Sequence, residues 1–311
     1  MSKVFITVGC KLDWIRNYSE KNINGPIEYV DCLSEKQSQI REKVESVRFS
    51  DSNIVICDRN PTVENRRFYY DMLNRKGREI NCIFFDVPIE MAFYYTDQIR
   101  DANRKRNEES NIYLFFNYFQ PPSLDEGFAK IFTVVPSQEK TSFGKNKAVF
   151  ISLLSLIDIA GDKKTISGVG DYSLFENVKK SIDVMTKNGY KIFLYADSPS
   201  LGNKDVRDCL FFAKDIVSQI GFEPKYICSN SKNGVQKGKH RIANPDSINN
   251  AAEKHKIDIS KSIMVGSMSF EKSLSQLCGF GYYFHKEVFF LANDFVLKQI
   301  KERSLASSEK E

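Results

Sequence analysis

The stretch KAVFISLLSLID, residues 147–158, decides how this chain is organised. Residues 149–151 form a short apolar run, which is typical of a strand buried in a parallel sheet. The residues before it, 142–147, are expected to be a connecting segment, so this strand opens the second half of the protein. Ser152 and Leu154 come directly after this apolar run.

Strand-like runs alternate with helical segments on both sides of this strand. In the first half, the predicted strands are 4–8, 53–58 and 80–87, and the predicted helices are 34–46, 61–76 and 88–101. In the second half, the predicted strands are 190–195, 225–228, 262–265 and 282–285, and the predicted helices are 173–187, 204–220, 246–256 and one at the end. Ser173 and Glu176 form a capping box that predicts the start of the helix at 173. This alternation predicts an α/β fold class with parallel sheets, and 311 residues suffice for two domains.

Composition limits the function classes. A 41% share of hydrophobic residues supplies two cores, and a net charge of +5 permits contact with nucleic acid without requiring it. The seven cysteines are scattered without a CxxC pair, which argues against a disulfide framework or a cysteine-rich zinc site and favours a reducing compartment. Neither a signal peptide nor an apolar run of membrane-spanning length is seen, so we expect a soluble intracellular protein without membrane contact.

Three segments of the first half occur in a recognisable order. They are IVICDRNPTVENRRFYYDML (54–73), INCIFFDVPIEMA (80–92) and PPSLDEGFAKIFTV (121–134). In this order the segments resemble the kinase domain of polynucleotide kinase–phosphatases. The resemblance implies a P-loop-kinase-like parallel sheet over residues 1–140.

The resemblance fails where that kinase binds phosphate. A P-loop needs G-x-x-x-x-G-K-[ST], because its glycines let backbone amides face the phosphates and its Lys and hydroxyl neutralise charge and hold Mg²⁺. After the first strand this chain has Gly9, but Lys11 comes too early and no hydroxyl follows it. The family's catalytic Asp aligns with Leu33, and Asp31 is out of register.

Two polar residues of the family's strand–helix segment are retained. Asp58 and Asn60 stand at the end of a predicted parallel strand, where they are candidates for a residual metal or phosphate contact. The alternative is that they act as turn or helix-cap residues.

A basic cluster lies in QIRDANRKRNEES, where the family carries arginines that cover phosphate. Its residues are Arg100, Arg104, Lys105 and Arg106. They are candidates for contact with nucleic acid. Acidic neighbours at Asp101, Glu108 and Glu109 favour instead a solvated helix face.

Two segments of the second half are similar to haloacid-dehalogenase phosphatases of the histidinol-phosphate and heptose-bisphosphate branch. These are NGYKIFLYADSPSLG (188–202) and the long segment 238–271, which ends in KSIMVGSMSFE. The resemblance implies a Rossmann-like phosphatase fold over residues 141–303, followed by a polar tail at 304–311. The phosphatase domain of polynucleotide kinase–phosphatases is related to this branch.

The catalytic positions of that phosphatase are altered in this chain. Its first strand ends in D-x-D-G-[TV], whose two Asp residues attack phosphorus, shuttle the proton and approach Mg²⁺. The corresponding residues here are Ser152 and Leu154, then Ser155 and Leu156. The phosphate-binding Thr and Lys and the metal-binding Asp correspond to Ala196, Ile242 and Ser267. Glu271 keeps an acid near its expected place, which makes it a further candidate for a residual metal or phosphate contact.

These substitutions predict a pseudoenzyme, since an aspartyl-phosphate requires a carboxylate nucleophile. We expect two domains that serve as a structural or adaptor subunit with other protein subunits as partners and nucleic acid nearby. No cofactor and no metal are expected. Two alternatives stay open: a working polynucleotide 5′-kinase or 3′-phosphatase with atypical sites, and a module that binds nucleic-acid ends.

Overall fold

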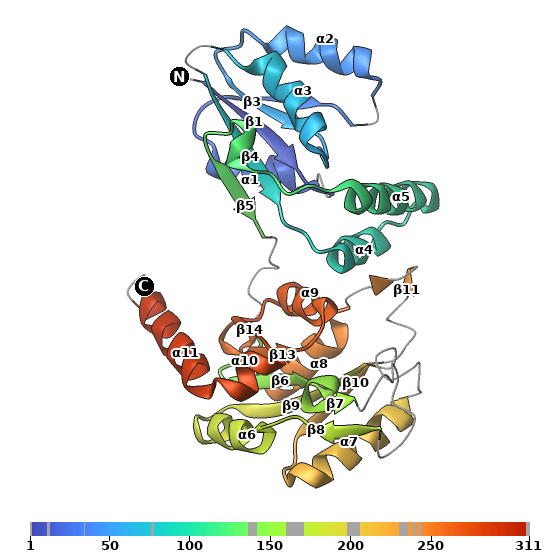
Figure 1. The fold of residues 1–311 in the computed structure, drawn as a ribbon, viewed down its shortest axis with the longest axis vertical. Coiled ribbons are helices and arrows are strands. Elements are labelled where there is room, and N and C mark those ends of the chain that lie inside the picture. Colours follow the sequence, from blue (N-terminus) through green and yellow to red (C-terminus); the bar gives the residue numbers. More distant parts are fainter. Residues whose placement is uncertain are drawn as a thin grey trace. The chain divides into compact units, whose positions relative to one another are not determined.

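The computed structural model divides the chain into two compact units, residues 1–136 and 137–311. It describes residues 2–10, 13–33, 35–75, 78–135, 142–159, 171–197, 206–229, 236–237, 240–241 and 244–308. Each unit is a parallel sheet with helices on its faces (Figure 1). The predicted α/β fold class with two parallel sheets is thereby confirmed.

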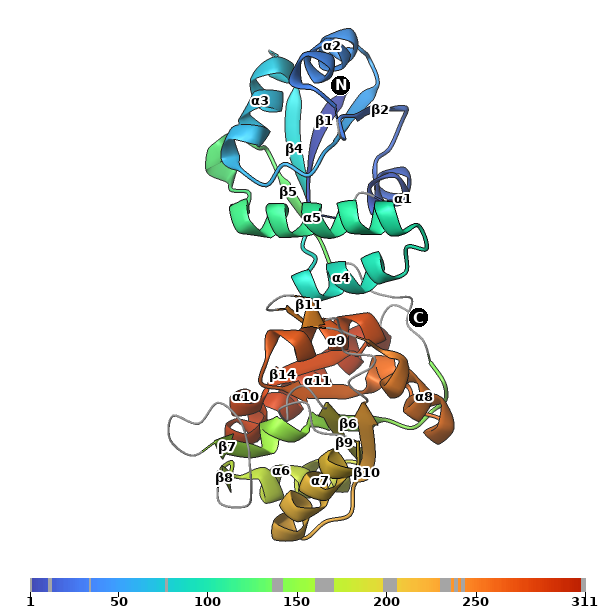
Figure 2. The ribbon, with the colours of Figure 1, turned by 90° about the vertical axis from the view of Figure 1, so that its right-hand side faces the viewer.

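The sheet of the first unit has the strand order β2-β3-β1-β4-β5. Its strands are β1 (Lys3–Val8), β2 (Ile27–Asp31), β3 (Asn53–Cys57), β4 (Glu79–Phe85) and β5 (Ile131–Val134). Its helices are α1 (Asp13–Asn22), α2 (Gln37–Val47), α3 (Val63–Leu73), α4 (Ile89–Asp97), α5 (Ala102–Tyr118) and the 3-10 turn η1 (Leu124–Glu126). Because the chain steps one way from β1 to β2 and the other way afterwards, right-handed crossovers place α1 on one face and α2 and α3 on the other (Figure 2).

The sheet of the second unit has the order β10-β9-β6-β13-β14, again parallel. Its strands are β6 (Ala148–Ser152), β9 (Lys191–Asp197), β10 (Lys225–Ser229), β13 (Ile263–Gly266) and β14 (Tyr282–His285). Short antiparallel pairs join β7 (Ile157–Ile159) to β8 (Tyr172–Leu174) and β11 (Gln236–Lys237) to β12 (His240–Arg241).

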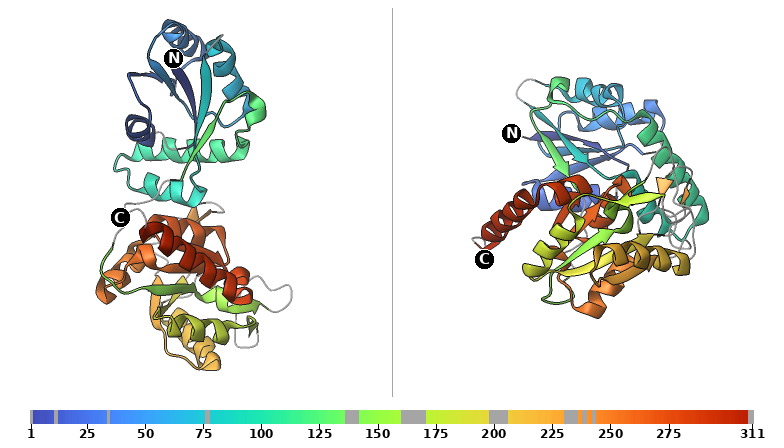
Figure 3. Two further views of the ribbon diagram at one scale, coloured as in Figure 1. Left: turned by 90° about the vertical axis from the view of Figure 1, so that its left-hand side faces the viewer. Right: turned by 60° about the horizontal axis from the view of Figure 1, so that its bottom comes forward.

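The helices of this unit cover both faces of its sheet. They are the 3-10 turn η2 (Leu153–Leu156), α6 (Val178–Lys187), α7 (Val206–Ile220), α8 (Asp246–His255), the 3-10 turn η5 (Ile259–Lys261), α9 (Ser269–Cys278), α10 (Lys286–Leu291) and α11 (Asn293–Ser308). Figure 1 shows α6 and α7 on one face and α8 and α9 on the other. The last helix, α11, lies beside β14, where the Tyr282 hydroxyl donates to the Ile300 carbonyl at 3.2 Å (Figure 3).

One sequence prediction for this unit is wrong. The helix predicted from residue 173 begins at Val178, because Ser173 lies in β8, where it pairs with Asp158. Pairing between distant residues has overridden the capping-box pattern. The helix α11 continues to Ser308, so it includes the first residues of the segment 304–311 that the sequence predicts to be a polar tail.

Candidate functional site

The connection from β1 to α1 is the place where a phosphate-binding loop would lie. Residues 9–12 alone separate the two elements, fewer than the G-x-x-x-x-G part of a P-loop. The Gly9 amide donates to the Arg59 carbonyl at 3.0 Å. A Cβ on Gly9 would lie 2.9 Å from the Phe85 Cβ, so close packing on β4 requires glycine here. Lys11 lies outside the described residues.

Asp58, which follows β3, carries a part-buried carboxyl group. The Tyr69 hydroxyl donates to its Oδ2 at 2.7 Å, and the Arg59 amide donates to its Oδ1 at 2.8 Å. Burial raises the pKa of Asp58, while the hydrogen bonds from Tyr69 and Arg59 offset part of that shift. A carboxyl group whose ionisation is opposed in this way is poorly suited to attract a cation.

Asn60 and Arg66 support the turn after β3. Asn60 is buried with φ of 48°, and its Nδ2 donates to the Thr7 carbonyl at 2.9 Å. The fully buried Arg66 guanidinium makes two parallel bonds to Glu126, at 2.7 and 2.8 Å. It also donates to the Asn60 carbonyl at 3.1 Å. The segments 54–73 and 121–134, which carry the family resemblance, are therefore held together by the Arg66–Glu126 ion pair.

The basic cluster lies around the start of α5, where its members differ in their surroundings. Arg100, Arg104 and Arg106 are exposed. Lys105 is half-buried and forms an ion pair with Asp97 at 2.6 Å. The Asp101 side chain caps the helix by accepting from the Arg104 amide at 2.8 Å. The two exposed arginines at 100 and 106 thus flank a lysine that has an intramolecular partner.

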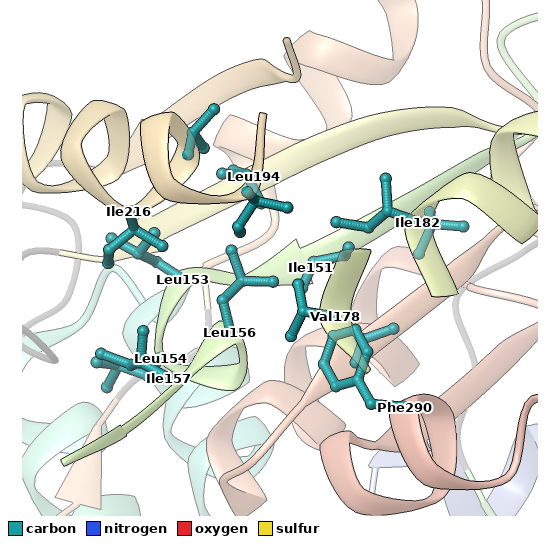
Figure 4. Close-up of a cluster of buried hydrophobic side chains, with 14 of the residues drawn as sticks. Ile151, Leu153, Leu154, Leu156, Ile157, Val178, Ile182, Leu194, Ile216 and Phe290 are labelled. Atoms are coloured by element: carbon teal, nitrogen blue, oxygen red, sulfur yellow. The ribbon is translucent and has the colours of Figure 1, made fainter. Parts of the chain in front are cut away.

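In the second unit, apolar side chains fill the carboxyl end of β6. Ser152 is 4% exposed and Leu154 8% exposed. Leu153, Leu154, Leu156 and Ile157 belong to one buried cluster with residues of β9, α6, α7 and α10. Figure 4 shows Leu153 and Leu156 near Leu194 and Ile216, with Leu154 beside Ile157.

Of the four remaining positions of this edge, three lie within the described residues. Ala196 is buried in β9, and Ile242 lies outside the described residues. Glu271 is 1% exposed, and its Oε2 accepts from the amides of Ser267 and Met268 at 2.6 and 2.9 Å. Glu271 therefore caps the start of α9, and its Oε2 is occupied by these two amides.

The residues at these two edges do not fit the Mg²⁺ ion that the family resemblance implies. Mg²⁺ prefers carboxylate and phosphate oxygens. Among the described side chains of the second edge, Ser152, Leu154 and Ala196 offer no carboxylate, and Glu271 is engaged as a cap. Across the described residues, no group of three His, Cys, Asp or Glu side chains is placed to hold a metal ion. No described helix is both long and apolar enough to cross a bilayer.

Sequence reasoning did not single out Tyr69, Arg66 or Asn81 as residues that shape a site. The first two complete the surroundings of Asp58 and Asn60, and partners so distant in sequence leave no local pattern. Asn81 did leave one, because it interrupts the apolar strand INCIFF and is fully buried in β4.

Comparison with known proteins gives one curated relative. Over 106 residues, 32% of this chain, the chain is 28% identical to the bifunctional polynucleotide phosphatase/kinase of Schizosaccharomyces pombe. It spans about a quarter of that protein's length (25%). No protein-family model matches.

Two solved structures have a general likeness to the chain. One is described as a HAD-like phosphatase from Mesorhizobium loti, with 14% identity and a TM-score of 0.35 over 46% of this chain and 74% of that one. The other belongs to the Pnkp1/Rnl/Hen1 RNA repair complex, with 12% identity and a TM-score of 0.34 over 91% and 96% of the two chains. Both TM-scores are low, so neither structure is used to assign the fold. The fold is assigned from the strand orders described above.

Proposed function

We propose that this chain is a pseudoenzyme related to polynucleotide kinase–phosphatases, and that it acts as a structural or adaptor subunit beside nucleic acid. One observation carries the proposal: Leu154 is packed in the core at the end of β6, where the related phosphatases need a carboxylate. Neither it nor the neighbouring Ser152 can form an aspartyl-phosphate.

The first unit supports the same proposal. Its β1–α1 connection is short, the Gly9 amide is bonded to Arg59, and burial opposes ionisation of Asp58. The described residues of this edge therefore do not supply the converging amides and the positive charge that hold nucleotide phosphates. What remains is two well-packed units whose surfaces are available to partners.

A combined assay and capture experiment tests the proposal. The chain is incubated with labelled ATP and Mg²⁺ and a 5′-hydroxyl oligonucleotide, and separately with a 3′-phosphate oligonucleotide. We expect no turnover above a no-protein control. Native capture from the source cells followed by mass spectrometry is expected to bring along nucleic-acid-processing proteins. Turnover that is lost in Asp58→Asn would instead support the alternative of an active kinase.

A second candidate function, binding of nucleic-acid ends, is favoured by the exposed arginines around the start of α5. Arg100 and Arg106 are exposed, whereas Lys105 is paired with Asp97. Arginine contacts with phosphate release counterions, so binding should weaken steeply with salt.

The arrangement of these side chains provides matched controls. Arg100→Ala with Arg106→Ala should weaken binding of a single-stranded oligonucleotide and reduce the slope of log affinity against log salt by about one to two. Lys105→Ala should have a smaller effect, because its charge is already neutralised by Asp97. Arg67→Ala, which removes an exposed arginine of α3 that faces Asp71, should leave binding unchanged. Equal affinities for all variants would exclude this function.

A further inference from the structure

A pocket of about 550 Å³ lies at the amino-terminal end of the first unit's sheet, at the opposite end from the edge considered above. Phe5, Asn81 and Phe132 line it from the strands β1, β4 and β5. They lie on one face, because Phe5 pairs in register with Asn81 and Phe132 with Ile83, two residues further along β4. The helix on that face, α1, packs through Tyr18 on Phe85 at the carboxyl end of β4, and the loop that follows α1 lines the pocket at the amino-terminal end.

One wall of the pocket is fixed by Asn53. Its Oδ1 accepts from the Lys3 amide at 2.9 Å, and its Nδ2 donates to the Asn24 carbonyl at 2.9 Å. The Asn53 amide donates in turn to the Pro26 carbonyl at 2.9 Å. The loop that precedes β2 is thereby held against the sheet, so the pocket has a defined shape before any ligand arrives.

The base of the pocket carries an amide with unused hydrogen-bonding capacity. Asn81 is 0% exposed, and its Oδ1 has no hydrogen-bond partner among the described residues. Hydrogen bonds from Lys3 and, to a smaller extent, from Asn81 lower the pKa of the Glu79 carboxyl. The NH₂ group of Asn81 therefore faces that carboxylate. The Asn81 carbonyl oxygen is left without a donor. Buried polar atoms in this state are uncommon and call for an explanation.

The other properties of the pocket favour a flat, uncharged ligand. Phe132 is 37% exposed, and its ring centroid lies 6.3 Å from that of Phe5, so aromatic surface borders the opening. Among the described residues that line the pocket, Lys3 supplies the positive charge, and it already forms an ion pair with Glu79 at 3.1 Å. Asp51 adds a negative charge to the rim. A phosphate would not be favoured there.

We propose that this pocket binds an unpaired adenine base, with the Asn81 amide reading its edge and Phe132 providing a stacking surface. An asparagine amide can accept from the adenine N6 amino group and donate to N7. The free Oδ1 of Asn81 would accept, and its NH₂ group has a second hydrogen for N7 beside the one that faces Glu79. Base stacking on an aromatic ring is favourable for single strands. This inference rests on the proposed association with nucleic acid, and it identifies one nucleotide contact, while the sugar and phosphate remain outside.

The test uses the full chain and adenosine, followed by ligand-observed NMR and equilibrium dialysis. Adenosine should bind saturably, and inosine, which has an oxygen in place of the N6 amino group, should bind about tenfold more weakly. Asn81→Leu, which keeps the volume and removes the amide, should abolish the preference for adenosine while its melting temperature does not fall. Phe132→Ala should weaken binding by about tenfold. Phe49→Ala is the matched control, because Phe49 is 70% exposed, belongs to the same unit and does not line the pocket.

The outcomes separate this inference from the proposed function. An absence of saturable adenosine binding, or equal binding of adenosine by the wild type and Asn81→Leu, overturns the pocket assignment. If an oligonucleotide binds through Arg100 and Arg106 but is insensitive to Asn81→Leu, the function stands and the pocket is excluded. If adenosine binds in the predicted manner but no assembly or oligonucleotide is found, the pocket stands without the function. If the pocket binds a peptide and adenosine has no effect on that binding, the inference is also overturned.

Discussion

Leu154 shows how one side chain changes what an edge of a sheet can do. A carboxylate at this position would have to be solvated or bound to metal, whereas an isobutyl group joins the buried cluster around Ile157. The burial of Leu154, at 8% exposure, means that the site is occupied by core packing. Reversal of the substitution therefore has a stability cost that a surface site would not have.

We expect that Ser152→Asp with Leu154→Asp will not restore phosphatase activity. The double variant should lose about 3 kcal/mol or more of unfolding free energy, because it buries carboxylates without a metal or hydrogen-bond donors. Urea unfolding and hydrolysis of a 3′-phosphate oligonucleotide with Mg²⁺ measure the two effects. Leu154→Met is the control and should cost less than about 1.5 kcal/mol. A stable double variant with turnover would contradict this account.

Asp58 provides a prediction about pH. Its pKa in the folded chain is raised above the ordinary 3.8, chiefly by burial. Between the pKa of the unfolded chain and that of the folded chain, the folded chain therefore keeps a proton on Asp58 that the unfolded chain has released. Stability from this group is complete below 3.8 and falls as pH rises through its pKa in the folded state. Asp58→Asn should remove this fall, since an amide can still bond to Tyr69 and to the Arg59 amide.

The measurement is urea unfolding of both proteins from acidic to neutral pH. The stability of Asp58→Asn relative to the wild type should increase over this range. Parallel curves would mean that Asp58 has an unperturbed pKa and is hydrated, which would reopen its candidacy as a metal or phosphate contact.

At the scale of elements, α9 shows how a residue near a family's metal-binding position can serve the backbone instead. The first amides of a helix lack partners within the helix, and the Glu271 carboxylate accepts from two amides at this start. Gly266 packs closely against the Glu271 side chain, because a Cβ added at Gly266 would lie 2.7 Å from the Glu271 Cβ. This packing keeps the carboxylate in place.

Glu271→Ala should lower the unfolding free energy by about 1–2 kcal/mol, because the amides of Ser267 and Met268 lose their acceptor. Glu271→Gln retains an acceptor oxygen and should cost less. Thermal unfolding of both variants measures the difference, and addition of Mg²⁺ should stabilise neither the wild type nor the variants. A rise in the melting temperature of the wild type with Mg²⁺ that Glu271→Ala abolishes would show that Glu271 binds metal.

Elements were predictable from sequence where their patterns are local. The strands β1, β3, β4, β6 and β13 are apolar runs and were predicted to within a few residues. No helix was predicted over 13–22 and no strand over 27–31, where the structure has α1 and β2. The strand β2 is only half-buried for most of its length, so its side chains carry little apolar signal.

At the scale of the whole molecule, each unit has its own sheet and its own buried cluster. We expect residues 1–135 and 142–311 to fold when they are produced separately, as domains with independent cores do. Circular dichroism and cooperative urea unfolding of each fragment check this. If one fragment is unfolded alone and folds when the other is added, its stability depends on the second unit.

The sequence by itself determined the α/β class. It also gave our predictions of two domains and of serine, leucine and alanine at positions where the resembling family has reactive side chains. Apolar runs and residue identity are local properties, which need no knowledge of distant contacts. The tertiary structure alone decided that Ser173 belongs to a strand, that Glu271 is a cap and that Asn81 lines a pocket with Phe5 and Phe132. Each of these depends on which residues, far apart along the chain, meet in the fold, and local sequence patterns do not encode such contacts.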